Sequence, residues 1–318
     1  MASDVPSQRP PVVVVTGPTA SGKTPIAIEL ARRFDGEIVN ADSMQVYRSM
    51  DIGTAKPSAE QREAAPHHLL DVVSPDARYS AGRYLREARA AAASIHARGG
   101  LVLLTGGTGL YIRAFLEGLV ETGEANSELR EALETEHAGA VAAGEPGRLH
   151  TRLAQLDPEA AGRIHPHDLK RTIRALELIE QGGRLASRQR GEHGFTDRPF
   201  RTLHLALDPG VAALKPRIDA RCLAMLEAGL LQEVRGLVER GYGFDLRPLQ
   251  AIGYRHMQAV VEGEQTLEMV LPALQTDTRR FAKRQRTWLR KVTGVEWRNP
   301  DRPDEILAEV ERFLEGES

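Results

Sequence analysis

One glycine-containing segment constrains the fold of this chain more than any other stretch. Residues 17–24 have the sequence Gly-Pro-Thr-Ala-Ser-Gly-Lys-Thr, which fits the pattern G-x-x-x-x-G-K-[ST]. An apolar run at residues 12–15 comes directly before it, and apolar residues with a helical period follow it at residues 26–34. A buried strand, a glycine loop and a helix N-terminus in this order form a phosphate-binding loop. We therefore expect an α/β core that binds a di- or triphosphate group.

The residue types of this loop explain how it would hold phosphate. The two glycines let successive backbone N–H groups turn towards an anion. The lysine adds a positive charge to that of the helix N-terminus, and the last threonine has a hydroxyl that suits a magnesium ion. The predicted phosphate-binding residues are Gly17, Pro18, Thr19, Ala20, Ser21, Gly22, Lys23 and Thr24, with Thr24 as the predicted metal ligand.

The pattern of apolar segments predicts a parallel sheet flanked by helices, with a helical insertion. Further strands are expected at residues 37–41, 101–104, 202–207 and 295–297. Helices are expected at residues 81–98, 110–116, 211–228, 230–240, 251–262, 266–292 and 303–314, with a disturbance at Pro272. Residues 43–79 are expected to be mostly irregular. We predict a disordered lead-in at 1–11, a core domain formed by 12–120 and 198–318, and an all-helical insertion at 121–197.

Two polar residues follow strands of the predicted sheet. Asp42 follows the second strand and Thr108 follows the third, within the glycine-rich segment 105–109. Ligands of parallel sheets bind at the carboxyl ends of the strands, so both residues should lie at the same edge as the phosphate loop. Asp42 could accept a proton from a substrate, lie near a magnesium ion, or only cap a turn. Its position favours a functional role.

Composition excludes several classes of protein. The chain has 318 residues, of which 41% are hydrophobic and 27% charged, and no apolar run approaches the roughly 20 residues of a membrane span. Cys222 is the single cysteine, which excludes internal disulfides and cysteine-rich zinc sites. Residues 1–11 lack the apolar centre of a signal peptide, so we expect a cytoplasmic protein without membrane contact. The sequence His-Pro-His-Asp at 165–168 has no metal-ligand spacing and is expected to begin a helix.

Positive charge is concentrated near the C-terminus. Seven basic and no acidic residues occur between positions 279 and 291, so a net charge of -2 leaves -9 for the rest of the chain. Arg279, Lys283, Arg286 and Arg290 would form one stripe on a helix, which is typical of a nucleic-acid contact. Some of these charges could instead reach the phosphate site. Arg217 and Arg221 share another helix face, which is either solvated or a clamp on phosphate oxygens.

Six segments together resemble the bacterial tRNA dimethylallyltransferase family, also called tRNA isopentenyltransferases. They are residues 17–24, 42–48, 50–57, 106–111, 251–254 and 282–288. The resemblance extends over residues 12–298. It implies transfer of a dimethylallyl group from dimethylallyl diphosphate to the exocyclic amine of the adenosine 3′ of the anticodon, in tRNAs that read codons beginning with U. It also implies magnesium as the cofactor, and we expect a monomer.

The resemblance further implies roles for individual residues. Asp42 would be the general base, Thr108 would contact the adenosine or the transferred group, and Arg217 would bind diphosphate. The expected contacts to the tRNA anticodon stem-loop are Asp42, Ser43, Met44, Gln45, Thr108, Arg130, Lys170, Arg171, Thr172, Ile173, Arg174, Gln250, Ala251, Ile252, Gly253, Tyr254, Arg255, Lys283 and Arg286. Residues 120–126 lack the proline-rich linker of the family.

Two other functions compete with this interpretation. A kinase of small molecules or nucleotides would share the phosphate loop, the sheet and a helical lid, but would not need the basic helix or the long loop after Asp42. A non-catalytic RNA-binding protein controlled by a nucleotide would explain the basic stripe and leave Asp42 and Thr108 without a role. The chain lacks the Asn-Lys-x-Asp segment of GTPases.

Overall fold

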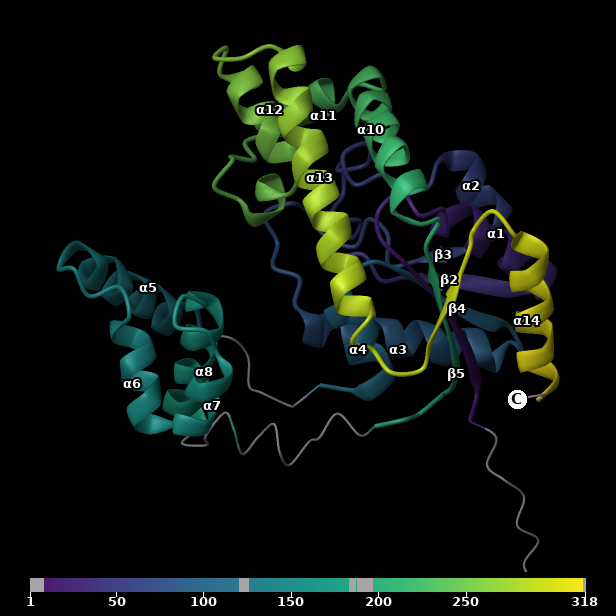
Figure 1. The fold of residues 1–318 in the computed structure, drawn as a ribbon, viewed down its shortest axis with the longest axis horizontal. Coiled ribbons are helices and arrows are strands. Elements are labelled where there is room, and N and C mark those ends of the chain that lie inside the picture. The colour runs from purple at the N-terminus through teal and green to yellow at the C-terminus, as the bar shows by residue number, and fades with distance from the viewer. Residues whose placement is uncertain (1–8, 120–125, 183–186, 188–196, 317–318) are drawn as a thin grey trace, which may run out of the picture. The chain divides into compact units, whose positions relative to one another are not determined.

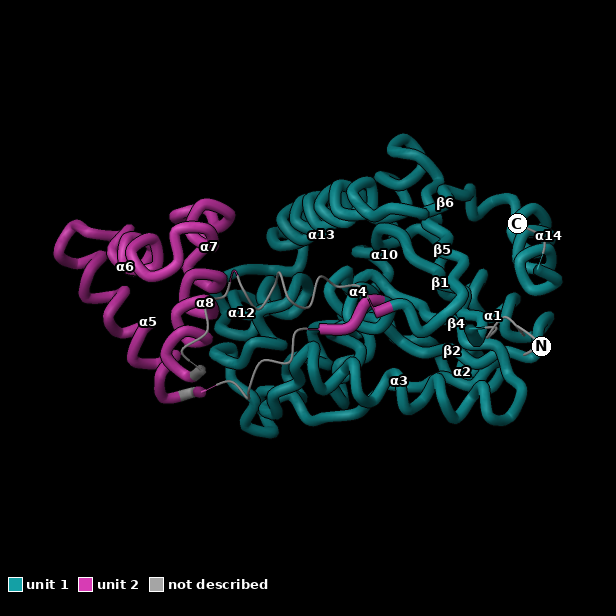
Figure 2. The backbone as a smooth tube through the Cα atoms, turned by 90° about the horizontal axis from the view of Figure 1, so that it is seen from below, with its two compact units in different colours: residues 1–116, 198–318 teal, residues 117–197 magenta. Residues whose placement is uncertain are grey.

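The computed structural model describes residues 9–119, 126–182, 187 and 197–316. Residues 1–8 of the expected lead-in and the expected domain boundary after residue 120 lie outside these ranges. The chain divides into two compact units (Figure 2). Unit 1 comprises residues 1–116 and 198–318, and unit 2 comprises residues 117–197.

A parallel sheet forms the centre of unit 1 (Figure 1). Among the described residues it has six strands in the order β3-β2-β4-β1-β5-β6, and every pair is parallel. The strands are β1 (Pro11–Thr16), β2 (Gly36–Asn40), β3 (His67–His68), β4 (Leu101–Gly106), β5 (Arg201–Leu207) and β6 (Val295–Arg298). The prediction of a parallel α/β fold is therefore confirmed.

Side-chain alternation along the strands divides the core of unit 1 into two layers. Val13 and Val15 of β1 pack on the helices α1 (Lys23–Arg33) and α14 (Pro303–Glu315). Val12 and Val14 face the other side, where α3 (Ala81–Ala97) and α4 (Gly109–Glu117) supply the partners. Because β1 is buried on both faces, its four consecutive valines form a continuous apolar run.

Five further helices of unit 1 lie between β5 and β6. They are α10 (Val211–Glu227), α11 (Leu230–Glu239), the 3-10 helix η1 (Arg247–Gln250), α12 (Tyr254–Val261) and α13 (Leu267–Leu289). Helices α10 and α13 pack together through a small core that includes Ile218, Cys222 and Ala282. Helix α13 is a single helix that includes Pro272, so the expected disturbance does not interrupt it.

The segment expected to be irregular, residues 43–79, contains regular structure. It includes α2 (Ala59–Ala64) and β3, which extends the sheet beside β2. A capping box between Ser58 and Gln61 begins α2. Lys56, with a buried side chain, ties the preceding loop to the segment after β3, since its ammonium group donates to carboxylate oxygens of Asp51 and Asp71, each at 2.6 Å.

Unit 2 contains helices and no strands within its described residues. These helices are α5 (Ser127–Ala142), α6 (Arg148–Leu156), α7 (Pro158–Arg163) and α8 (Leu169–Gly182), around a core that includes Leu133, Leu153 and Leu176. Asp157 caps α7 by accepting the Ala160 N–H, and Pro158 occupies the first turn. In the described parts of both units, no helix combines the length and apolar character needed to cross a membrane.

Candidate active site

The carboxyl ends of four strands bring the predicted catalytic residues to one edge of the sheet. The register aligns Thr16 of β1 with Gly106 of β4 and Ala206 of β5, and aligns Asn40 of β2 with Thr105 of β4. The phosphate loop, Asp42, Thr108 and Asp208 directly follow these strands. The prediction that the loop, Asp42 and Thr108 share an edge is therefore confirmed.

The phosphate loop needs glycine at its first position. Gly17 has a φ of 147°, and a Cβ there would lie 2.4 Å from the Leu207 carbonyl oxygen and 2.6 Å from Oγ of Ser21. Gly22, with a φ of 86°, turns the chain into α1. The Lys23 ammonium group lies back over the loop and donates to the carbonyls of Gly17 at 3.1 Å and Pro18 at 2.8 Å.

Two partly buried cations and one carboxylate act on each other at this edge. Burial and the charge of Arg221 lower the pKa of Lys23 to about 8, while the Asp42 carboxylate opposes that shift. Burial also lowers the pKa of Arg221, on α10, and Asp42 again opposes the shift. Because like charges raise each other's energy, an anion bound here would be stabilised by both cations.

Asp42 and Thr108 are joined through Ser43. The Thr108 hydroxyl accepts the Ser43 N–H at 2.9 Å and donates to the Ser43 hydroxyl at 3.2 Å. The Thr108 N–H donates to the Ala41 carbonyl at 3.1 Å, which ties the ends of β2 and β4 together. Asp42 Oδ1 accepts the Met44 N–H at 2.8 Å, which fixes the carboxylate. These contacts form a rigid wall beside the phosphate loop.

Each glycine around Thr108 leaves room for a neighbour. A Cβ on Gly106 would lie 2.3 Å from the Ala41 backbone, so glycine lets β2 and β4 converge. A Cβ on Gly107 would lie 2.3 Å from Nε2 of Gln285, and one on Gly109 would lie 2.4 Å from the Trp288 ring. The glycine-rich sequence therefore fits this turn under α13.

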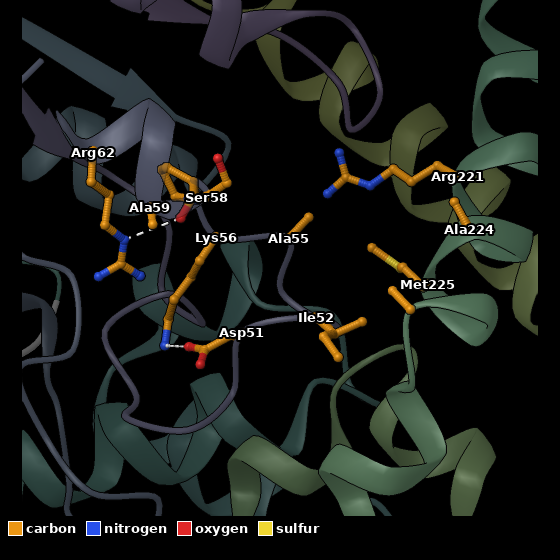
Figure 3. A pocket seen from close by; sticks show the side chains of 12 residues that line it. Asp51, Ile52, Ala55, Lys56, Ser58, Ala59, Arg62, Arg221, Ala224 and Met225 are labelled. Atoms are coloured by element: carbon orange, nitrogen blue, oxygen red, sulfur yellow. Dashed lines mark hydrogen bonds and ion pairs between the residues drawn. The ribbon is translucent and has the colours of Figure 1, made fainter. Parts of the chain in front are cut away.

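An open pocket of about 640 Å³ lies between the loop after Met50 and helix α10 (Figure 3). Ile52 and Ala55 line it from the loop, and Met225 lines it from α10. Arg221 extends into the pocket, as Figure 3 shows. The pocket thus combines apolar residues with charged ones, among them the Arg221 guanidinium group, whose charge acts on Lys23.

Comparison with known proteins assigns the chain to a family. The model of the family described as IPP transferase matches residues 45–292. The chain is 51% identical over 297 residues to a tRNA dimethylallyltransferase of Anaeromyxobacter dehalogenans (strain 2CP-C). This match covers 93% of the chain and 97% of that protein. The chain belongs to the IPP transferase family. The expected resemblance is confirmed.

Solved structures of the IPP transferase family share the fold. The full-length tRNA isopentenylpyrophosphate transferase of Bacillus halodurans is 37% identical with a TM-score of 0.70, and the match covers 98% of this chain and 97% of that one. A eukaryotic dimethylallyltransferase acting on tRNA is 28% identical with a TM-score of 0.85, and the match covers 97% of this chain and 80% of that one.

The two arginines of α10 occupy different surroundings. Arg217, the predicted diphosphate ligand, forms an ion pair with Asp301 at 2.8 Å and is 36% exposed. Arg221, one turn later, acts on Lys23 and Asp42. The structure thus brings Arg221 to the candidate site, whereas the role of Arg217 stays a prediction from the family resemblance.

Several predicted RNA contacts in unit 1 also hold the protein together. The Gln45 amide donates to the carbonyls of Thr54 and Ala55, and Met44 packs against the core. The Tyr254 side chain is fully buried, and its hydroxyl donates to Glu233 at 2.6 Å. The other residues of this segment differ in exposure: Gln250 and Arg255 are exposed, Ala251 and Ile252 are partly buried, and Gly253 is buried.

Helix α13 presents its basic residues in two directions. Arg286, 17% exposed, pairs with Asp208 at 2.8 Å after β5, and Arg279 pairs with Asp219 of α10 at 3.0 Å. Lys283 is exposed. The stripe is therefore partly neutralised by carboxylates distant in sequence, and Arg286 points towards the sheet edge.

The predicted contacts of unit 2 lie on α5 and α8. Lys170 and Arg171 are exposed, while Thr172 and Ile173 are buried. Arg130 and Arg174 both contact Oε2 of the buried Glu177, at 2.8 Å and 2.7 Å. Burial raises the pKa of Glu177, but the hydrogen bonds from both arginines outweigh this and hold that pKa below its usual range.

Two residues that organise this part of the fold were missed by sequence reasoning. Gln285 contacts both Thr19 and Gly107. Glu233 accepts the N–H groups of Asp51 and Ile52, each at 2.8 Å, and so anchors the loop that lines the pocket. A neutral glutamine within the basic segment 279–291 was the available signal for Gln285, and nothing local distinguishes Glu233.

Proposed function

We propose that this chain transfers a dimethylallyl group from dimethylallyl diphosphate to the exocyclic amine of the adenosine 3′ of the anticodon, in tRNAs that read codons beginning with U. The products are N6-dimethylallyladenosine in tRNA and diphosphate. The observation that supports this most strongly is the shared sheet edge, where Asp42 and Thr108 adjoin a phosphate loop in a member of the IPP transferase family.

The phosphate loop would stabilise the leaving group. When the bond between C1 of the dimethylallyl group and the diphosphate oxygen breaks, both bonding electrons stay with the diphosphate. Backbone N–H groups at the start of α1, with the side chains of Lys23 and Arg221, offer preorganised positive charge to this anion. The mutual repulsion of the two cations increases the advantage of binding it. Arg217 is a further candidate ligand from the family resemblance.

Asp42 would accept the proton that the adenine amine loses. An exocyclic amine is a weak nucleophile, so a positioned carboxylate contributes roughly 10²–10⁴-fold to the rate. The contact from the Met44 N–H fixes the carboxylate, and the Thr108–Ser43 contacts fix the adjoining turn. Thr108 is thereby placed beside Asp42, where it can contact the adenosine or the transferred group.

A magnesium ion fits the chemistry of this site. Thr24 lies in the first turn of α1 directly after Lys23, and its hydroxyl oxygen is a ligand type that magnesium accepts. Within the described residues, no three carboxylate, histidine or cysteine side chains are grouped to hold a metal. Thr24, diphosphate oxygens and water would therefore complete the coordination. Such an ion would supply charge neutralisation of the diphosphate.

The exposed basic residues would hold the tRNA backbone. Lys170, Arg171 and Lys283 are exposed on α8 and α13. Phosphate contacts from such residues fix the position of an RNA without reading its sequence. They would offset the few kcal/mol needed to take the target base out of its stack, a cost that is smallest in a single-stranded loop.

The experiment that tests this function follows labelled dimethylallyl diphosphate. We expect label in unmodified tRNA bearing adenosine 3′ of the anticodon, and none in the same tRNA with guanosine there. ATP with a nucleoside monophosphate serves as the parallel substrate pair for a kinase, which the family membership does not favour. Phosphoryl transfer without labelled tRNA would refute the proposal.

A further inference from the structure

One polar side chain of α13 contacts both sides of the candidate site. Gln285 is only 9% exposed. Its Oε1 accepts the Thr19 N–H at 2.8 Å, and its Nε2 donates to the Gly107 carbonyl at 3.2 Å. Thr19 belongs to the phosphate loop, and Gly107 directly precedes Thr108. A single amide therefore joins the expected diphosphate site to the turn that carries Thr108.

The surroundings of Gln285 hold it in this place. The neighbouring Arg286 donates to Asp208 at 2.8 Å, and Trp288 fills the space that a side chain at Gly109 would need. Gly107 leaves room for the amide, because a Cβ there would lie 2.3 Å from Nε2. This part of α13 is thus fixed to the segments that follow β1, β4 and β5.

The chemistry of glutamine suits both contacts at once. Its amide offers an acceptor and donors on one planar group, whereas glutamate offers acceptors alone and methionine offers neither strong donor nor strong acceptor. A flipped amide would place an N–H against the Thr19 N–H and an oxygen against the Gly107 carbonyl. The two partners therefore define one orientation.

We propose that Gln285 is a positioning residue that fixes the diphosphate relative to the acceptor amine. This rests on the proposed function, because the phosphate loop would hold the leaving group and the Asp42–Thr108 wall the acceptor. A displacement of about 1 Å between reacting groups costs up to about 10²-fold in rate. Loss of the contact should therefore slow the reaction while both substrates still bind.

The decisive measurement separates kcat from KM in Gln285→Met, which removes both hydrogen bonds and keeps the side-chain length. We expect kcat to fall roughly 10–100-fold, with KM for tRNA and for dimethylallyl diphosphate each within about threefold of wild type. Gln275→Met is the matched control on the same helix, where the amide donates to the Asp219 carbonyl. It should leave kcat within about twofold.

A second set of variants tests the contact from its other side. Gly107→Ala should lower kcat because the new methyl group displaces the amide, and Gln285→Ala should lower it because the amide is lost. In the double variant the clash is relieved, so kcat should be no lower than in Gln285→Ala alone. A double variant whose loss of kcat equals the product of the two single-variant losses would overturn the proposal.

The outcomes distinguish the two proposals. Absence of label transfer to tRNA by the wild-type enzyme refutes the proposed function. Wild-type transfer with unchanged kcat in Gln285→Met, or with a loss confined to KM, overturns the positioning role alone. If Gln285→Met fails to fold, the Gly107→Ala and double-variant comparison decides the question.

Discussion

Two pairs of basic side chains occur in this molecule in contrasting surroundings. In unit 2, Arg130 and Arg174 share the buried carboxylate of Glu177, so both charges are compensated within the protein. At the phosphate loop, Lys23 donates to backbone carbonyls and is repelled by Arg221, which helps to lower its pKa to about 8. The first group is electrostatically complete, whereas the second is short of negative charge.

This difference separates a structural cluster from a ligand site. A buried charge with partners contributes to folding when its hydrogen bonds are made, whereas buried like charges cost stability and favour an anion. The negative charge that the phosphate loop lacks is what a diphosphate would bring. The following predictions test that distinction through its consequences for stability and turnover.

The largest effect is expected from Lys23→Met. Prenyl transfer should fall roughly 10²–10³-fold, because a preorganised charge at the leaving group is lost. The melting temperature should stay the same or rise, since a partly buried cation repelled by Arg221 is removed. Steady-state kinetics and thermal unfolding check both expectations, with the exposed Lys215→Met on α10 as control. A large drop in melting temperature would show that Lys23 stabilises the fold, and would contradict its assignment to a ligand site.

The opposite result is expected in unit 2 from Glu177→Gln. Two arginines then lose their shared carboxylate. Because both guanidinium groups are about one-third exposed, we expect the loss to cost about 1–3 kcal/mol of unfolding free energy. Hydrogen exchange of α5 and α8 measures this locally, and the affinity for dimethylallyl diphosphate should not change. Glu180→Gln on the same helix breaks a half-exposed pair with Arg152 and should cost less than about 1 kcal/mol. Weaker binding of dimethylallyl diphosphate by Glu177→Gln would contradict the view that the unit 2 cluster and the phosphate loop act independently.

A smaller effect is expected from pH. The arginines hold the pKa of Glu177 below its usual range despite burial, so the unfolded chain binds its proton at higher pH than the folded one. The stabilisation is therefore complete above the ordinary glutamate pKa of about 4.3, and is lost as pH falls through the folded-state pKa. Unfolding of α8 measured between neutral and acidic pH should show this loss in wild type. If Glu177→Gln shows the same loss of stability at acidic pH, another titrating group causes that loss.

The comparison also shows what sequence could predict. The loop at residues 17–24 and the apolar strands defined the sheet, and the carboxyl ends of its strands placed Asp42 and Thr108, because those relations are local or follow from parallel topology. β3 was missed since His67 and His68 form too short a strand to show a period. Whether Arg217 or Arg221 lies at the site depends on how α10 packs against the sheet. The four-residue spacing puts both on one helix face and does not predict which of them that will be.

The basic residues show the same limit. Sequence showed that residues 279–291 contain no acid, yet Asp208 and Asp219, some 60 to 78 positions away, neutralise Arg286 and Arg279. Arg130 likewise meets Glu177, 47 positions away, only in the folded unit, whereas Arg174 lies three positions before Glu177 on the same helix. A charge pattern predicts that a helix is basic, but long-range packing decides which of its charges remain available to a partner.

The smallest effect should come from a single exposed charge on α13. Lys283→Gln is expected to weaken tRNA binding a few-fold and to reduce the slope of log affinity against log salt by about one, because one phosphate contact is lost. Arg279→Gln provides the contrast, since Asp219 already compensates that guanidinium and the slope should change less. Filter binding across a salt series gives both slopes. Equal slopes for the two variants would mean that ion pairing within the protein does not decide which charges reach the RNA.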